Sequence, residues 1–241
     1  QAHNDDLAGT VARHTGRFVG LAALPMQDVV EAVRELRRAV TVLGLAGAGI
    51  GTDFGRFLDD PAMDELYSTC VELNVPLFIH PTQSGIDGPL RDPRVRRFDL
   101  DLVLEYGFEE LLAVSTLVFG GVTERHPGLD ICVSHGGGFT ALAMGKLRKL
   151  AERRKAAPEW IREPGAFDRA LRRLWFDCHV TGGREFEFAV AQLGTERLVY
   201  GTNFGGWDKG TGPDVATMRH TLNANATRLL RLRPELVAGL R

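Results

Sequence analysis

Six short apolar segments alternate with amphipathic helical segments along this chain, and this alternation limits most strongly what the chain can fold into. Within each segment the apolar residues are nearly continuous rather than placed at every second position, which is typical of parallel strands covered on both faces. The segments are 17–25, 44–52, 75–81, 129–137, 174–180 and 197–204. Amphipathic stretches at 26–44, 61–74 and 182–194 are predicted to form helices between some of them.

The alternation of strands and helices predicts a parallel α/β sheet or barrel. A nucleotide-binding doubly wound sheet is disfavoured, because no glycine-rich phosphate-binding motif follows the first strand. Polar residues stand instead at the carboxyl ends of the strands, and this is the edge at which (β/α)8 barrels build their active sites. These residues are Thr52, Asp53, His80, His135, Asp177, His179 and Asn203.

We therefore predict one domain over residues 1–241, folded as a TIM-like (β/α)8 barrel of which about six strands are present. Two further βα units come to roughly 60 residues at ~250 residues per barrel, so we expect the amino end of the barrel to be absent. A barrel without two of its strands would have two open sheet edges, which is a liability for solubility.

Composition limits the partners and the compartment. The 29 basic and 31 acidic residues nearly balance, so we expect no binding to nucleic acid or to an anionic membrane. The basic run at 146–155 has leucines at helical spacing and is predicted to be a solvated helix face rather than a phosphate-binding patch. The longest apolar stretch, 111–122, is too short to span a bilayer. Three widely separated cysteines form no disulfide framework, and together with the lack of a visible signal peptide they favour a cytoplasmic protein.

Three strand ends carry residues with the chemistry of a metal site. His80 closes "LFIHP", where the following proline ends the ladder, although a core histidine is an equally good interpretation. His135 precedes three glycines, which would let a ligand approach the imidazole; the alternative is a tight turn with an incidental histidine. Asn203 ends the last strand within "YGTNF". Imidazole nitrogen together with an oxygen ligand suits zinc or a similar divalent ion.

The motifs "FIHP", "VSHGGG" and "YGTNF", in this order at strand ends, resemble the amidohydrolase-related metal-dependent family that includes aminocarboxymuconate-semialdehyde decarboxylase and the resorcylate-type decarboxylases. "RFVGLAALPMQD" and "NANATRLLRL" extend the resemblance over essentially the whole chain. The resemblance implies a distorted (β/α)8 barrel with one divalent metal ion, usually zinc. Assembly into a homodimer is implied by the resemblance alone.

Carried over to this sequence, the resemblance makes His80 a metal ligand and His135 the general acid/base. Asn203 stands where the family has a metal-binding aspartate, and the family's HxH ligand pair has no counterpart in this sequence. Lys146 stands where the family tends to have an arginine that reaches the substrate carboxylate, and Lys offers a point charge instead of a bidentate fork. Trp207 is predicted to wall the pocket, unless it is a packing residue.

The resemblance implies a metal-dependent decarboxylase of a small carboxylated substrate, aromatic or of muconate type. The same residues could serve a metal-dependent hydrolase, since a metal-bound water can attack a carbonyl. We expect the metal to be weakly held, because the HxH pair and the aspartate carboxylate are both missing, so a catalytically inactive homologue is a third interpretation. Asp177 is predicted to brace the site, and the segment 82–97 either folds over the mouth of the barrel or is a solvated loop.

Overall fold

The six predicted strands all form, and they build one parallel sheet whose order follows the chain from β1 to β6. The computed structural model describes residues 1–82, 92–180, 182–206 and 215–232. Each strand is shorter than the apolar segment that contains it. The strands are β1 (Ala22–Ala23), β2 (Ala48–Gly51), β3 (Leu77–His80), β4 (Ile131–Val133), β5 (Trp175–Asp177) and β6 (Leu198–Val199).

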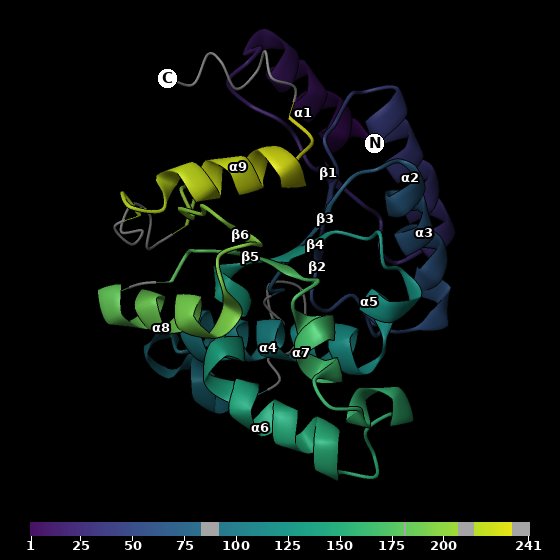
Figure 1. The fold of residues 1–241 in the computed structure, drawn as a ribbon. Helices are drawn as coiled ribbons and strands as arrows, with labels where there is room; N and C mark the ends of the chain where they lie inside the picture. The colour runs from purple at the N-terminus through teal and green to yellow at the C-terminus, as the bar shows by residue number, and fades with distance from the viewer. Residues whose placement is uncertain (83–91, 181, 207–214, 233–241) are drawn as a thin grey trace.

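Helices surround the sheet, as a barrel fold requires (Figure 1). They are α1 (Ala2–Arg13), α2 (Val29–Thr41), α3 (Asp64–Glu72), α4 (Tyr106–Phe119), α5 (Val122–Arg125), α6 (Thr140–Arg153), α7 (Ala166–Leu171), α8 (Gly183–Leu193) and α9 (Arg219–Leu229). The helices predicted at 26–44, 61–74 and 182–194 are confirmed as α2, α3 and α8. The carboxylate of Asp28 starts α2 by accepting hydrogen bonds from the backbone N–H groups of Val30 and Glu31.

The strand register places the polar strand ends side by side. Ile50, Ile79 and Val133 are paired across β2, β3 and β4, and they form one buried layer of the core. The residue after Ile79 is His80, and in β5 Asp177 is the last residue of the strand. Because all six strands run the same way and are in register, the loops that follow them meet at one edge of the sheet.

Two side-chain amides cover the outer edges of the sheet. Asn4 of α1 accepts a hydrogen bond from the N–H of Ala23 at 2.9 Å and donates to its carbonyl at 2.9 Å, so it stands in for a neighbouring strand beside β1. At the opposite edge, the amide of Asn225 in α9 donates to the Leu198 carbonyl of β6 at 2.8 Å. Within the described residues β1 and β6 each pair with one strand only, so the two open edges expected from the sequence are present, and amides from flanking helices satisfy some of their backbone groups.

Replacing Asn225 with alanine is expected to lower the free energy of unfolding by about 3 kcal/mol, because the variant leaves the carbonyls of Leu198 and Thr195 without their donor. Asn223 is exposed on the same helix and provides the matched control, whose alanine variant should change stability by less than about 0.5 kcal/mol. Urea unfolding of both variants measures the difference. Equal stabilities would show that the edge contact contributes nothing.

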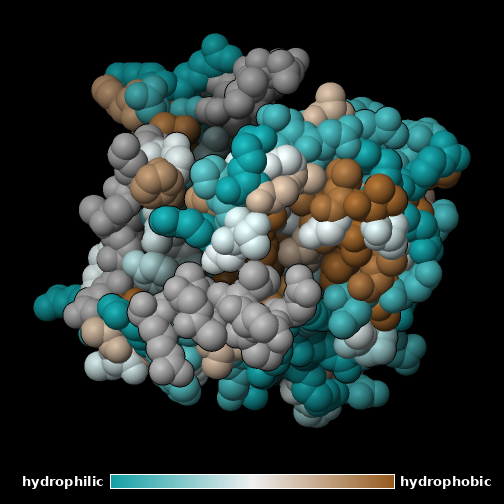
Figure 2. All heavy atoms as spheres, turned by 90° about the horizontal axis from the view of Figure 1, so that it is seen from above, coloured by the Kyte–Doolittle hydropathy of each residue, from teal (hydrophilic) through white to brown (hydrophobic). Residues whose placement is uncertain are grey.

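The surface is mixed in character. On the face seen from above, hydrophilic residues cover much of the surface and hydrophobic residues gather in one area (Figure 2). Within the described ranges no helix is both long enough and apolar enough to cross a membrane. The basic run at 146–155 lies largely within α6, as predicted for a helix face.

Candidate active site

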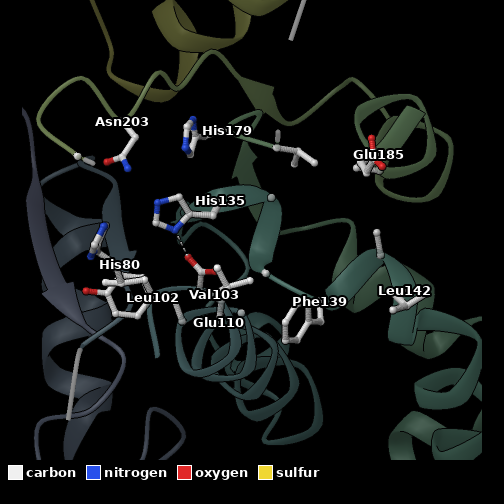
Figure 3. A pocket seen from close by; sticks show the side chains of 18 of the residues that line it. His80, Leu102, Val103, Glu110, His135, Phe139, Leu142, His179, Glu185 and Asn203 are labelled. Carbon is white, nitrogen blue, oxygen red and sulfur yellow. Dashed lines mark hydrogen bonds and ion pairs between the residues drawn. The ribbon is translucent and has the colours of Figure 1, made fainter. Parts of the chain in front are cut away.

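A cavity of about 780 Å³ opens where β3, β4, β5 and β6 end (Figure 3). One part of its wall is polar and carries His80, His135, His179 and Asn203. The rest is mostly apolar, with side chains from the segment before α4, from helices α6 and α8, and from the residues next to α6 and after β5. The apolar residues are Leu102, Val103, Phe139, Ala141, Leu142, Val180, Phe188 and Ala189. A flat organic ligand with one polar end would match this division of the wall.

Three imidazoles lie next to one another in the polar part. The ring centroids of His80 and His135 are 5.2 Å apart, and those of His135 and His179 are 5.4 Å apart. The amide of Asn203 lines the same cavity (Figure 3). The structure therefore brings together the three strand-end residues singled out in the sequence, and it adds His179, which had no role assigned from the sequence.

The backbone at two of these residues is in the left-handed region, with φ of 47° at His135 and 44° at Asn203. Such conformations cost about 1–3 kcal/mol for non-glycine residues and cluster at functional sites. The glycines after His135 are needed for the turn: a Cβ at Gly138 would lie 2.3 Å from the carbonyl oxygen of Gly107 in α4. The "SHGGG" motif thus lets the loop of His135 sit directly on α4.

A buried carboxylate orients His135. Glu110 of α4 has a side chain that is 1% exposed, and its Oε1 lies 2.6 Å from Nδ1 of His135 and accepts a hydrogen bond from the Ser134 hydroxyl at 2.8 Å. Burial raises the pKa of Glu110, while the hydrogen bond from His135 opposes that shift. Because the contact with Glu110 uses Nδ1, Nε2 of His135 lies on the cavity side (Figure 3).

Two further residues of the site, His80 and Asp177, have pKa values shifted by their surroundings. His80 donates from Nδ1 to the carbonyl of Pro81 at 3.0 Å, and its pKa is lowered by partial desolvation and by the neighbouring His135. His80 is therefore a neutral imidazole at neutral pH. Burial raises the pKa of Asp177, whose Oδ1 accepts from the backbone N–H groups of His179 at 3.0 Å and Gly136 at 3.3 Å. Asp177 thus connects the loops that carry His135 and His179.

A model of the family described as amidohydrolase matches residues 1–232. The chain belongs to this family. It is 31% identical over 203 residues to a 2-amino-3-carboxymuconate-6-semialdehyde decarboxylase from Dictyostelium discoideum, and the match covers 83% of this chain and 55% of the relative. It is 28% identical over 220 residues to a gamma-resorcylate decarboxylase from Rhodococcus jostii, covering 83% of this chain and 64% of that relative. The chain therefore spans less than two thirds of the length of these relatives.

The fold also resembles that of a decarboxylase of known structure. A dihydroxybenzoic acid decarboxylase from Polaromonas sp., solved with bound manganese and the inhibitor 2-nitroresorcinol, has a TM-score of 0.72 at 24% identity, covering 98% of this chain and 76% of that chain. This similarity, together with the family membership, confirms the prediction of a TIM-like barrel of the metal-dependent hydrolase type, with six strands in the part of the chain that the structure describes.

Family membership raises the question of a metal centre, and the described residues supply only part of one. His80 and Asn203 face the cavity with a nitrogen and an oxygen donor. No group of three or more His, Cys, Asp or Glu side chains in the described ranges is placed to hold one ion. An imidazole and a neutral amide do not make a complete ligand set for a divalent cation. A metal bound between them would need further donors from outside this pair.

The predicted substrate contact of Lys146 finds no support in the site. Lys146 is exposed on α6 and is not among the described residues that line the cavity. The cavity side of α6 is taken by Ala141 and Leu142, and Lys146 lies one helical turn beyond Leu142. Trp207 lies outside the described residues, as does the larger part of the segment 82–97 that was predicted to cover the mouth.

Glu110 is a residue of the candidate site that the sequence alone did not reveal. It lies in the second turn of α4, and the eight residues that follow it, 111–118, carry no charge. A glutamate next to such an apolar stretch must find a buried partner or remain at the surface. The pattern is compatible with a buried carboxylate, but nothing in the spacing names His135 as its partner.

Proposed function

We propose that this chain belongs to a decarboxylase that acts on a small carboxylic acid of aromatic or muconate type. The observation that carries the proposal is the pair of Glu110 and His135, which presents an oriented imidazole to a cavity with largely apolar walls. The names of the two decarboxylases that resemble the chain in sequence support the same class of substrate.

In this reaction His135 transfers a proton to carbon. When the bond between the ring or chain carbon and the carboxylate breaks, the electron pair stays on that carbon and carbon dioxide leaves. His135 gives a proton from Nε2 to this carbon and is afterwards reprotonated from solvent. Glu110 stabilises the imidazolium form and fixes the tautomer, as a carboxylate does in a catalytic triad. A positioned acid of this kind contributes about 10²–10⁴-fold to a rate.

The wall of the cavity suits a reaction that removes charge from a carboxylate. None of the described residues that line it is Lys or Arg. A tight ion pair would stabilise the charged ground state more than the transition state, in which the carboxylate is becoming neutral carbon dioxide. The largely apolar wall contacts the rest of the substrate.

A divalent ion, when bound, would polarise a substrate oxygen beside the reacting carbon. We propose His80 and Asn203 as its donors in this chain, and zinc or manganese as the ion. Since the second donor is a neutral amide, we expect weak retention: dialysis against a chelator should strip the ion, and the metal content of the dialysed protein measures this.

The Asn203→Asp variant should bind manganese about tenfold or more tightly, because charged ligands dominate the affinity for a divalent cation. Asn223→Asp adds the same charge to an exposed position on α9 and is the matched control. Calorimetric titration of manganese into the three proteins gives the affinities. No gain for Asn203→Asp over the control would remove Asn203 from the proposed donor set.

The function itself is tested by incubating the protein with γ-resorcylate (2,6-dihydroxybenzoate) and related acids in deuterated water with manganese present. We expect release of carbon dioxide and a product with deuterium at the carbon that carried the carboxylate. A panel of such acids that is neither bound nor decarboxylated would contradict the proposal. Hydrolysis of lactone or amide substrates by the same residues would replace it with the hydrolase interpretation.

A further inference from the structure

Tyr106 occupies the polar part of the same cavity. It is the first residue of α4 and follows a π-helical turn at Asp101–Glu105. This short irregular turn joins α4 directly, and Leu102, Val103 and Tyr106 all line the cavity wall. Turns of this kind recur at functional sites because they re-aim side chains within a helix. The ring of Tyr106 meets the ring of His80 edge-on, with centroids 6.3 Å apart.

The hydroxyl of Tyr106 is a donor that the described structure leaves unused. The described contacts of Tyr106 give its phenolic oxygen no hydrogen bond, whereas the hydroxyl of buried Tyr67 donates to the carbonyl of Leu58 at 2.6 Å. Burial raises the pKa of Tyr106, so its hydroxyl keeps its proton at neutral pH. A tyrosine in a ligand cavity usually finds a partner for this group, and here the partner would come from the ligand.

A carboxylate in this cavity needs donors, and the described lining offers neither Lys nor Arg. His80 already uses its Nδ1 proton on the Pro81 carbonyl. The ring of His80 is a neighbour of both Tyr106 and His135, with ring-centroid distances of 6.3 Å to Tyr106 and 5.2 Å to His135. Tyr106 and His135 thus line one cavity and share His80 as a neighbour, and a single small molecule in that cavity can contact both.

We propose that the Tyr106 hydroxyl donates a hydrogen bond to a carboxylate oxygen of the substrate and so positions the adjacent carbon at His135. This inference rests on the proposed function and gives Tyr106 the role that the family resemblance assigned to Lys146. A neutral donor holds the carboxylate without the full charge of an ion pair. Its hydrogen bond weakens as carbon dioxide forms, so Tyr106 contributes to substrate binding more than to the rate of the chemical step.

The test compares two ligands that differ only in the carboxylate, namely 2,6-dihydroxybenzoate and resorcinol. Each is titrated at equilibrium into the wild-type chain, Tyr106→Phe and Tyr200→Phe, at the same manganese concentration. Tyr200 is 47% exposed and is not among the described lining residues, so its variant is the matched control. We expect Tyr106→Phe to bind the acid about 10- to 100-fold more weakly, the size expected for losing a hydrogen bond to a charged group. Its affinity for resorcinol should stay within about twofold of wild type, a change below about 0.5 kcal/mol.

The ratio of the two affinities within one variant does not depend on the folded fraction, so a loss of stability cannot imitate the expected result. Equal weakening of both ligands would assign Tyr106 to packing of the cavity wall, and unchanged affinities would remove it from the site; either outcome overturns the inference while the proposed function stands. A wild-type chain that binds neither ligand overturns both. With active protein, Tyr106→Phe should raise KM and leave kcat nearly unchanged.

Discussion

Replacing His135 with asparagine is expected to lower kcat for decarboxylation by about 10²–10⁴-fold, because the variant removes the proton that the reacting carbon must receive. Asparagine tolerates the left-handed backbone that His135 adopts at φ 47°, so the turn before the glycines should persist. The rate is measured as carbon dioxide released under saturating substrate. In deuterated water the amount of deuterated product formed per unit time should fall in parallel with the rate, while each product molecule still carries one deuterium.

His220 is exposed on α9, and His220→Asn is the matched control, for which no change in rate is expected. Binding of resorcinol should be retained in the His135 variant, which would show that the cavity has kept its shape. Undiminished decarboxylation by His135→Asn would exclude His135 as the proton donor and would turn attention to His179, whose ring centroid lies 5.4 Å away.

Glu110→Gln is expected to lower kcat by roughly 100-fold, less than the loss of a triad carboxylate in a protease. The amide keeps the shape of the side chain and can still accept from Nδ1 of His135, but it lacks the charge that stabilises the imidazolium. The free energy of unfolding should not fall, because a neutral amide avoids the cost of burying a carboxylate that is 1% exposed. We therefore expect the Glu110→Gln variant to lose activity without losing stability.

Ser134→Ala is a milder change to compare with Glu110→Gln, because it removes a hydrogen bond to Oε1 of Glu110 and leaves the negative charge of Glu110 in place. We expect the rate of this variant to remain within about tenfold of wild type, as for the loss of one neutral donor. Single-turnover rates and urea unfolding curves on the same preparations separate the two effects. If Glu110→Gln matched wild type in rate, the carboxylate would have only a structural role at the base of the cavity.

The sequence by itself determined the strands and the edge at which the polar residues meet. Continuous apolar segments predicted buried parallel strands, and all six form at the predicted places. In a parallel sheet the carboxyl ends of all strands lie on one side, so a histidine or an amide that ends a strand must face that side. That is why His80, His135 and Asn203 could be predicted to converge although 123 residues separate the first from the last.

Only the tertiary structure decided which helix faces meet that edge. The spacing of residues along a helix shows which of them lie on the same face. It does not show how the helix is rotated about its axis, because packing against the sheet and the neighbouring helices sets that rotation. Lys146 of α6 is exposed because it lies one turn along the helix beyond Leu142, which lines the cavity, and the rotation of α4 brings Glu110 and Tyr106 to the cavity. The amides of Asn4 and Asn225 meet the sheet edges for the same reason. Such contacts join residues far apart in the chain, and they exist only once the core has fixed the position of each helix.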